Sequence, residues 1–239
     1  MAKSFISLLI FLVFFGTLSV TGQVLPGTIK PKKIALTFDA CMTKGMLHRV
    51  ESGEDKLLIN SAVISYLQQE KVPATIFITG LWAEKYPEIM RNISSDSLFE
   101  IGNHSYSHRG FTDKCYSLPI LSACEKVADI IRSQEVLTRL IGKKPKLFRF
   151  PGGCYTASDM ALVKNLGLKV VGWTFPSGDA FNGNTEAIVQ NVLSRARPNA
   201  IVVFHITEGH YAPATAKALK VIIPSLRKQG YEFSRVSDL

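Results

Sequence analysis

Short, mostly apolar runs recur along this chain, and segments with helical spacing or loops separate them. The runs cover residues 34–38, 74–78, 98–102, 146–150, 168–175, 200–204 and 231–236. Most are continuously apolar rather than alternating, which is typical of strands that are buried on both faces of a parallel sheet. Apolar residues at helical spacing predict helices over 57–69, 81–93, 118–141, 158–166, 185–195 and 213–229, and residues 43–56 are expected to form a loop.

This alternation predicts a single α/β domain over residues 34–239, in which helices cover a distorted seven-stranded β/α barrel. A doubly wound open sheet is the alternative, but the sequence contains neither a G-x-G-x-x-G motif nor a phosphate loop to support nucleotide binding. No self-similar repeat of about 33 to 45 residues is visible, so a solenoid is not expected.

The first residues predict export. Lys3 precedes a strongly apolar run at 5–15 and small residues that end at Gly22. This pattern is typical of a secretory signal peptide over residues 1–22, with an extended lead-in at 23–33. An uncleaved membrane anchor is the alternative, although the apolar run is shorter than the roughly 20 residues that a span needs. Either interpretation places the domain in the periplasm, the cell envelope or the extracellular space.

Export affects how the four cysteines are interpreted. An even number of cysteines in an oxidising compartment favours disulfides, and four cysteines allow three pairings. Cys115 with Cys124 would close a local loop and leave Cys41 with Cys154, whereas free buried thiols are the alternative.

The formal net charge of +9 favours anionic partners such as an acidic envelope glycan over nucleic acid, although a well-solvated surface explains it almost equally well. The oligomeric state is left open.

Ionisable residues follow or end the expected strands. His104 and His108 come just after the run at 98–102, and a helical turn there would let both imidazoles reach a single cation. Two hydrogen-bonding histidines are the alternative. Because the carboxyl ends of β/α barrel strands carry the chemistry, the other groups at such positions are candidates for the same site. These groups are Asp39, Arg149, Asp179 and His205.

Five segments together resemble the polysaccharide deacetylases with a NodB homology domain, the carbohydrate esterases that remove N- or O-acetyl groups from chitin-like and peptidoglycan sugars. The resemblance covers about residues 33–236. Its motifs, in family order, are residues 37–39, 104–108, 149–153, Trp173 with Asp179, and 203–205. The expected fold is therefore a NodB-like barrel, and the expected activity is that of a hydrolase acting on carbon–nitrogen bonds other than peptide bonds.

The resemblance implies a role for each matching residue. Asp39 is similar to the general base, Arg149 to the residue that orients it, and His205 to the general acid, whose charge Asp179 would support. His104 and His108 look like the ligands of a divalent metal, most simply Zn2+, with Co2+ or Ni2+ as alternatives. The residues implied to contact substrate are Pro151, Gly152, Gly153 and Trp173. Each residue also has a structural alternative. Asp39 would cap a turn, Arg149 would form an ion pair, and His205 would be a hydrogen-bonded core histidine. Trp173 would occupy a core position.

The chain departs from the family pattern at Ala40, where a metal-ligating aspartate usually stands. Three interpretations remain: Asp39 or a water fills the third position, Cys41 supplies a thiolate, or metal binding is weak. Asp39 or water is ranked first, because a thiolate at Cys41 conflicts with a disulfide there. Gly152 also replaces a common aromatic residue of the groove wall.

The leading hypothesis is thus an exported, metal-dependent deacetylase of an N-acetylated glycan. The alternatives are a degenerate glycan-binding module that has lost the metal and an amidohydrolase acting on small substrates. The membrane is a partner only if the leader is uncleaved, and which glycan is bound stays open.

Overall fold

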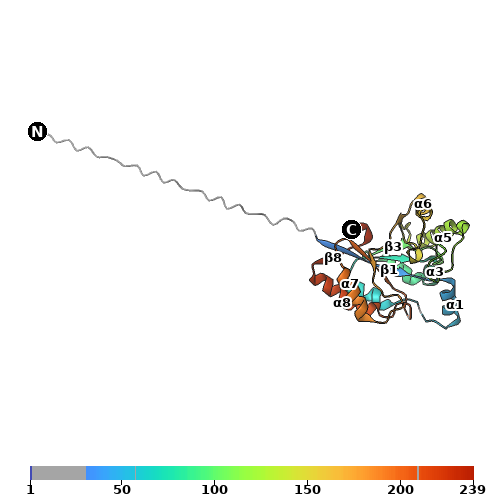
Figure 1. Ribbon diagram of the computed structural model, residues 1–239, viewed down its shortest axis with the longest axis horizontal. Coiled ribbons are helices and arrows are strands. Elements are labelled where there is room, and N and C mark those ends of the chain that lie inside the picture. Colours follow the sequence, from blue (N-terminus) through green and yellow to red (C-terminus); the bar gives the residue numbers. More distant parts are fainter. Residues whose placement is uncertain (2–30, 57, 209) are drawn as a thin grey trace. The chain divides into compact units, whose positions relative to one another are not determined.

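A parallel sheet forms the centre of the fold, with helices around it (Figure 1). The computed structural model describes residue 1 and residues 31–56, 58–208 and 210–239. Residues 2–22 of the expected signal segment at 1–22, and most of the lead-in at 23–33, therefore lie outside the described residues. In the part that is described, no helix combines the length and the hydropathy needed to cross a bilayer.

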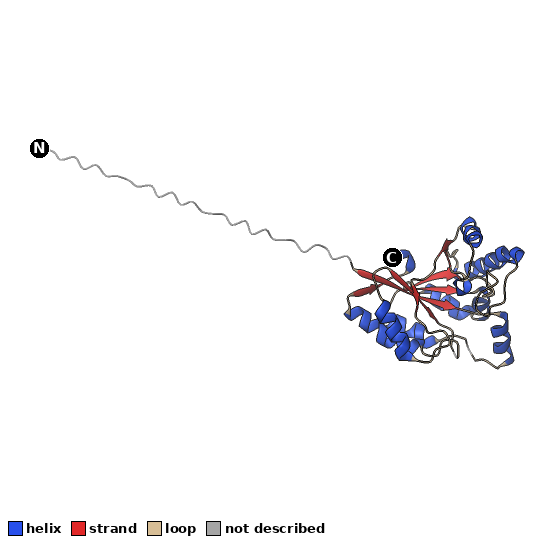
Figure 2. Ribbon diagram, viewed as in Figure 1, coloured by secondary structure: helices blue, strands red, loops and turns tan. Residues whose placement is uncertain are grey.

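The strands are β1 (Lys32–Ala40), β2 (Ala74–Ile78), β3 (Phe99–Asn103), β4 (Leu147–Phe148), β5 (Lys169–Val170), β6 (Phe175–Pro176), β7 (Ala200–His205) and β8 (Tyr231–Phe233). The α-helices are α1 (Lys44–Ser52), α2 (Ser61–Gln69), α3 (Gly80–Lys85), α4 (Pro87–Ser95), α5 (Ala123–Ile141), α6 (Ala157–Asn165), α7 (Thr185–Arg195) and α8 (Thr215–Lys228). Two 3-10 turns, η1 (Pro151–Gly153) and η2 (Val236–Asp238), complete the set of elements within the described residues. Figure 2 shows the strands gathered between the helices.

The sheet curls into the expected distorted barrel. Its strand order is β5-β4-β3-β2-β1-β7-β6, every pair is parallel, and β8 adds to the first part of β1. The two ends of this path, β5 and β6, follow each other in the chain with only residues 171–174 between them. A connection this short requires the first and last strands of the path to come close together, so the sheet is curved.

The side chains of β1 alternate between two environments. Leu36, Phe38 and Ala40 join the large apolar cluster beneath the helices. Ala35 lies in a second cluster with Phe77, inside the barrel. Because successive side chains of a strand point to opposite faces, Thr37 and Asp39 also point inward. The inner face of β1 therefore becomes polar toward its carboxyl end.

Several element boundaries differ from the sequence prediction. The expected strand 168–175 is two short strands, because the chain between them turns its carbonyl groups toward Arg149. The expected loop at 43–56 contains α1, which Thr43 caps by accepting a hydrogen bond from the backbone of Met46, and which ends at Gly53 in the left-handed region. The expected helix at 81–93 divides at Pro87, which begins α4.

The disulfide joins Cys115 to Cys154, with 5.7 Å between their Cα atoms. The expected pairing of Cys115 with Cys124 and of Cys41 with Cys154 is therefore wrong. Cys124 is exposed at the start of α5, and Cys41 is buried just beyond β1; both are free. The loop that contains Cys115 folds onto the turn before Cys154, a tertiary contact that sequence spacing does not reveal.

Candidate active site

The strand ends that carry the predicted residues lie at one level of the barrel. In the sheet register, Asp39 is opposite His205 on β7, and Asn103 at the end of β3 is opposite Phe148 at the end of β4. His104 and Arg149 are the next residues after that pair. The structure thus brings Asp39, His104, Arg149 and His205 to the same edge, as the sequence predicted.

Arg149 holds the carboxylate of Asp39 inside the barrel. Its Nη1 donates to Asp39 Oδ1 at 2.8 Å and to the Thr37 hydroxyl at 2.9 Å. Its Nε and Nη2 donate to the carbonyl groups of Val171 and Gly172 at 3.3 and 3.0 Å, so this fully buried charge is both paired and hydrogen-bonded. Burial alone would raise the pKa of Asp39, but the charge and hydrogen bond of Arg149, together with the charges of His104 and His205, lower that pKa below its usual value. Asp39 is therefore ionised at neutral pH.

Asp179 holds the ring of His205. Its Oδ1 lies 2.9 Å from His205 Nδ1, and its Oδ2 accepts from the backbone N–H of His205 at 2.8 Å and from the Thr215 hydroxyl at 2.7 Å. Ser177 donates to Oδ1 at 3.0 Å. Burial lowers the pKa of His205, but the charge and hydrogen bond of Asp179, together with the charge of Asp39, more than compensate, so the pKa of His205 is raised. Asp179 therefore favours the imidazolium form and directs Nε2 away from itself.

His104 presents a nitrogen without a hydrogen-bond partner. Its Nδ1 lies 2.9 Å from the carbonyl oxygen of Arg149, and because a carbonyl only accepts, Nδ1 carries the proton. Its Nε2 is buried, has no hydrogen-bond partner among the described residues, and faces Asp39 Oδ2 at 3.5 Å. Burial lowers the pKa of His104 despite the nearby carboxylate of Asp39. The Nε2 lone pair is therefore free at neutral pH.

His108 reaches His104 through a tight turn and not through the helical turn that the sequence predicted. Ser105 and His108 have positive φ angles of 67° and 52°, and the two imidazole centroids are 4.9 Å apart. Asp129 on α5 holds this turn by accepting from the backbone N–H of Tyr106 at 2.8 Å and from Ser107 Oγ at 2.6 Å. Burial lowers the pKa of His108 to about 3, so this imidazole is also neutral at neutral pH.

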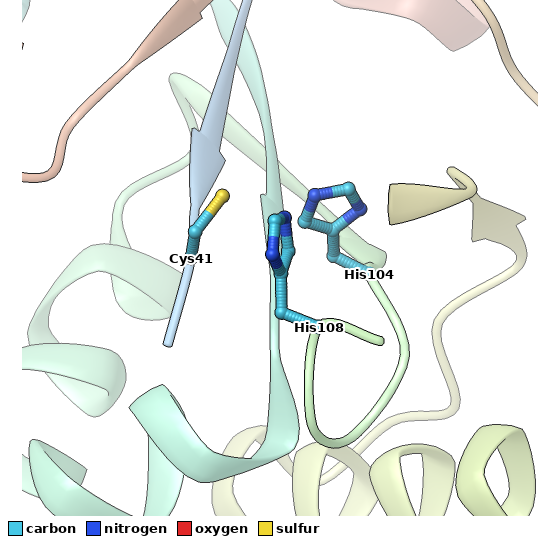
Figure 3. Close-up of side chains that lie close together, drawn as sticks. All are labelled: Cys41, His104 and His108. Atoms are coloured by element: carbon cyan, nitrogen blue, oxygen red, sulfur yellow. The ribbon is translucent and has the colours of Figure 1, made fainter. Parts of the chain in front are cut away.

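Cys41 completes a cluster with the two histidines. One donor atom from each of Cys41, His104 and His108 lies within 4.8 Å of the other two (Figure 3). Burial raises the pKa of the Cys41 thiol, and the carboxylates of Asp39 and Asp179 raise it further. Two imidazoles and a thiol in this arrangement are a donor set for a transition metal.

Comparisons with known proteins identify the family of this chain. Residues 27–171 match the family described as polysaccharide deacetylase. A peptidoglycan-N-acetylglucosamine deacetylase of Bacillus cereus is 30% identical over 207 residues, which are 87% of this chain and 68% of the relative. The chain belongs to the polysaccharide deacetylase family. It is accordingly a hydrolase that acts on carbon–nitrogen bonds other than peptide bonds.

Other members of the family share the fold. A chitooligosaccharide deacetylase of Bradyrhizobium is 29% identical over 191 residues, covering 74% of this chain and 82% of the relative. The crystal structure of a peptidoglycan N-acetylglucosamine deacetylase superposes with a TM-score of 0.74 at 28% identity, covering 87% of this chain and 88% of that one. A family 4 acetyl xylan esterase from Clostridium thermocellum, in complex with a cobalt ion, gives 0.68 at 26% identity, covering 87% and 89%.

Aromatic rings cover the turn that follows Arg149 in this deacetylase. A Cβ atom on Gly153 would lie 2.5 Å from the ring of Trp173, and one on Gly152 would lie 3.1 Å from the ring of Tyr116. Both glycines have positive φ angles, 69° and 61°. Glycine is therefore required here both by the backbone and by the close approach of the two rings. Pro151, the first residue of this turn, is buried.

Sequence reasoning missed several residues of the site. Tyr116, which lies beside Gly152, is 86% exposed and offers a large apolar surface to a ligand. Thr215 and Asp129 position the active-site groups through hydrogen bonds from α8 and α5. Their positions in the sequence carry no motif that could have identified them. Cys41 was not missed, because the sequence already offered its thiolate as a third ligand, ranked after Asp39 or water.

Proposed function

We propose that this protein is an exported, metal-dependent deacetylase that removes N-acetyl groups from a cell-wall glycan. The observation that carries the proposal is the convergence of an ionised carboxylate, two neutral imidazoles and an Asp179-supported His205 at one edge of the barrel. The named activities of the relatives point to peptidoglycan or a chitin-like glycan as the substrate. O-acetyl groups are a second possible target, since one structural relative is an acetyl xylan esterase.

The residues present fit a divalent metal. His104 Nε2 is buried, has no hydrogen-bond partner among the described residues, and points toward an ionised carboxylate that offers only lone pairs. Two acceptors that face each other in a buried site are unfavourable unless a cation or a donor lies between them. His104 and His108 would hold the ion, and the donor set favours Zn2+, with Co2+ and Ni2+ as alternatives. When bound, such an ion lowers the pKa of water and polarises the acetyl oxygen.

Asp39 has the position and the charge of a general base. Arg149 occupies Asp39 Oδ1, whereas Oδ2 faces His104 and is available to accept a proton from the attacking water. The buried ion pair keeps Asp39 ionised over the neutral pH range. Thr37 and the carbonyl groups of Val171 and Gly172 fix the guanidinium and thereby the orientation of the carboxylate.

His205 has the features of a general acid. Asp179 binds Nδ1 and raises the pKa, which leaves Nε2 to donate a proton to the departing amine of the sugar. The side chain of His205 is 26% exposed, whereas that of Asp39 is 6% exposed, so the acid lies nearer to solvent and to the polymer. Trp173 and Tyr116 border the turn at 151–153 and would contact the sugar rings.

Export is supported by two separate observations. Lys3 and the apolar run at 5–15 have the pattern of a signal peptide. The Cys115–Cys154 disulfide is a feature of proteins from oxidising compartments. The substrate assigned by the proposal, a cell-wall polymer, is met in the periplasm, the envelope or the extracellular space.

The test is acetate release from N-acetylglucosamine oligomers and from peptidoglycan. The purified protein should release acetate with Zn2+ or Co2+, lose this activity on chelation, and recover it when metal is returned. Asp39→Asn and His104→Ala should abolish release, whereas Arg91→Met, which changes an exposed residue of α4, should not. Binding of the glycan without release of acetate under any metal would instead support the degenerate binding module.

A further inference from the structure

We propose that the Cys41 thiolate is the third protein ligand of the metal, in place of the carboxylate that Ala40 lacks. The inference rests on the proposed metal dependence and adds a ligand of different chemistry to it. It is carried by the position of Cys41 in the cluster with His104 and His108, and by His104 Nε2, which has no hydrogen-bond partner within the described part of the chain. Figure 3 shows the thiol approaching the two imidazoles from the end of β1.

The alternation of β1 explains why residue 41 and not residue 40 is suited to this role. Ala40 is fully buried and belongs to the apolar cluster beneath the helices, on the outer face of the sheet. Asp39 points inward, and Cys41, two residues later, reaches the same side of the chain. Position 40 therefore holds a methyl group that packs in the apolar cluster, whereas position 41 holds a sulfur atom beside the histidines.

Cys41 is available as a ligand because it is not oxidised in the structure. The disulfide uses Cys115 and Cys154, so the conflict between a disulfide and a thiolate at Cys41 does not arise. Cys41 is only 8% exposed, which shields its sulfur from other thiols. The remaining free cysteine, Cys124, is exposed on α5 and provides a matched control.

A Cys-His-His set has the composition of a catalytic zinc site. Such sites use three protein ligands and leave the fourth position for water or substrate. The hydrogen bond from His104 Nδ1 to the Arg149 carbonyl fixes the tautomer in the manner of metal-ligating histidines. Binding replaces the proton of the Cys41 thiol with the metal, and the proton passes to solvent. With the thiolate as third ligand, Asp39 stays free to act as the base.

A thiolate ligand has a consequence for metal choice. Soft sulfur donors favour Zn2+ and Co2+ over Mn2+ and Mg2+, which prefer oxygen ligands. A site with an aspartate as third ligand would discriminate less strongly. The protein should therefore bind Zn2+ and Co2+ tightly and Mn2+ weakly.

The experiment is a titration of the metal-free protein with Co2+, followed by absorption spectroscopy. The wild-type protein should show the near-ultraviolet charge-transfer absorption of a thiolate bound to cobalt, at one cobalt ion per chain. Cys41→Ser should lose this band and bind Co2+ more than about 100-fold more weakly, which exceeds the roughly 10- to 100-fold loss that follows removal of an outer-shell hydrogen bond. Cys41→Asp should lose the band but keep much of the affinity, and Cys124→Ser should match the wild type.

Thermal denaturation of each metal-free variant separates loss of a ligand from loss of the fold. Three results would overturn the assignment. The wild-type protein could bind cobalt without the charge-transfer band, Cys41→Ser could bind cobalt with the same affinity as the wild type, or the wild-type protein could bind no cobalt. Acetate release without the band would refute only the thiolate ligand, and the band without acetate release would refute only the proposed function.

Discussion

Replacing Asp179 with asparagine tests the role of the His205 pair with little change in shape. Asp179 is buried and accepts four hydrogen bonds, from His205 Nδ1, the backbone N–H of His205, Ser177 and Thr215. An asparagine can accept on one side only. With its oxygen toward Thr215 and the backbone N–H, its NH2 group faces Nδ1, so the ring proton of His205 moves to Nε2 and the imidazolium is no longer stabilised.

The size of the effect follows from the charge-assisted hydrogen bond that is lost. Such a bond contributes about 1.5–3 kcal/mol, which corresponds to a roughly 10- to 150-fold fall in kcat/KM. The Asp179 carboxylate raises the pKa of His205, so the variant should also shift the alkaline limb of the pH–rate profile to lower pH. Acetate release measured across pH gives both quantities, and Asp113→Asn, in an exposed loop, is the control.

The contribution of the Asp179–His205 pair to the free energy of unfolding should depend on pH. The pKa of Asp179 is lowered on folding, so its contribution is present above the unfolded value of about 3.9 and is lost as the pH falls through the folded pKa. The pKa of His205 is raised, so its contribution is present below about pH 6.5 and is lost as the pH rises through the folded pKa. The difference in free energy of unfolding between wild type and Asp179→Asn should therefore be largest between about pH 4 and 6.5. An unshifted alkaline limb, or a stability difference that is the same at about pH 5 and about pH 9, would refute the reasoning.

Three further predictions concern the support of the site. Arg149→Met leaves Asp39 buried without its partner and should lower the free energy of unfolding, measured in urea, by about 3–5 kcal/mol. Arg91→Met, in an exposed pair, should lower it by at most about 1 kcal/mol. Equal losses in the two variants would contradict the role of the buried pair. Tyr116→Ala should raise KM for a glycan oligomer about 2- to 12-fold with kcat nearly unchanged, because a stacking contact contributes about 0.5–1.5 kcal/mol to binding. An unchanged KM would show that Tyr116 does not contact the glycan. Removing the disulfide by Cys154→Ser should lower the free energy of unfolding by about 4 kcal/mol for a separation of 39 residues, and the variant should become insensitive to reductant, unlike the wild type.

The fold and most of the site were predictable because parallel strands deliver their carboxyl ends to one edge. That rule placed Asp39, His104, Arg149 and His205 together; in the structure, Asp39 lies opposite His205 in the register, and His104 and Arg149 follow the paired ends of β3 and β4. The split of the strand at 168–175 was not predictable, because it depends on Arg149 drawing the carbonyl groups of Val171 and Gly172 inward. The α1 helix was predictable in principle from Thr43 and Gly53, but the polar composition of the segment favoured a loop.

The details around the metal cluster depend on tertiary contacts. The turn from His104 to His108 is held by Asp129, which lies on α5, and no local pattern connects the two. Cys41 was ranked below Asp39 as a ligand because an exported cysteine was expected to be oxidised. The partner that a cysteine finds depends on the path of distant loops, and here the loop at Cys115 meets Cys154 instead.

X-ray data collected on both sides of the zinc absorption edge, from crystals of zinc-loaded protein, test the central claim most directly. The account predicts one anomalous peak about 2.0–2.1 Å from His104 Nε2 and from a ring nitrogen of His108, on the side that faces Asp39. The absence of a peak in this cluster, or a peak held by other residues, would contradict it.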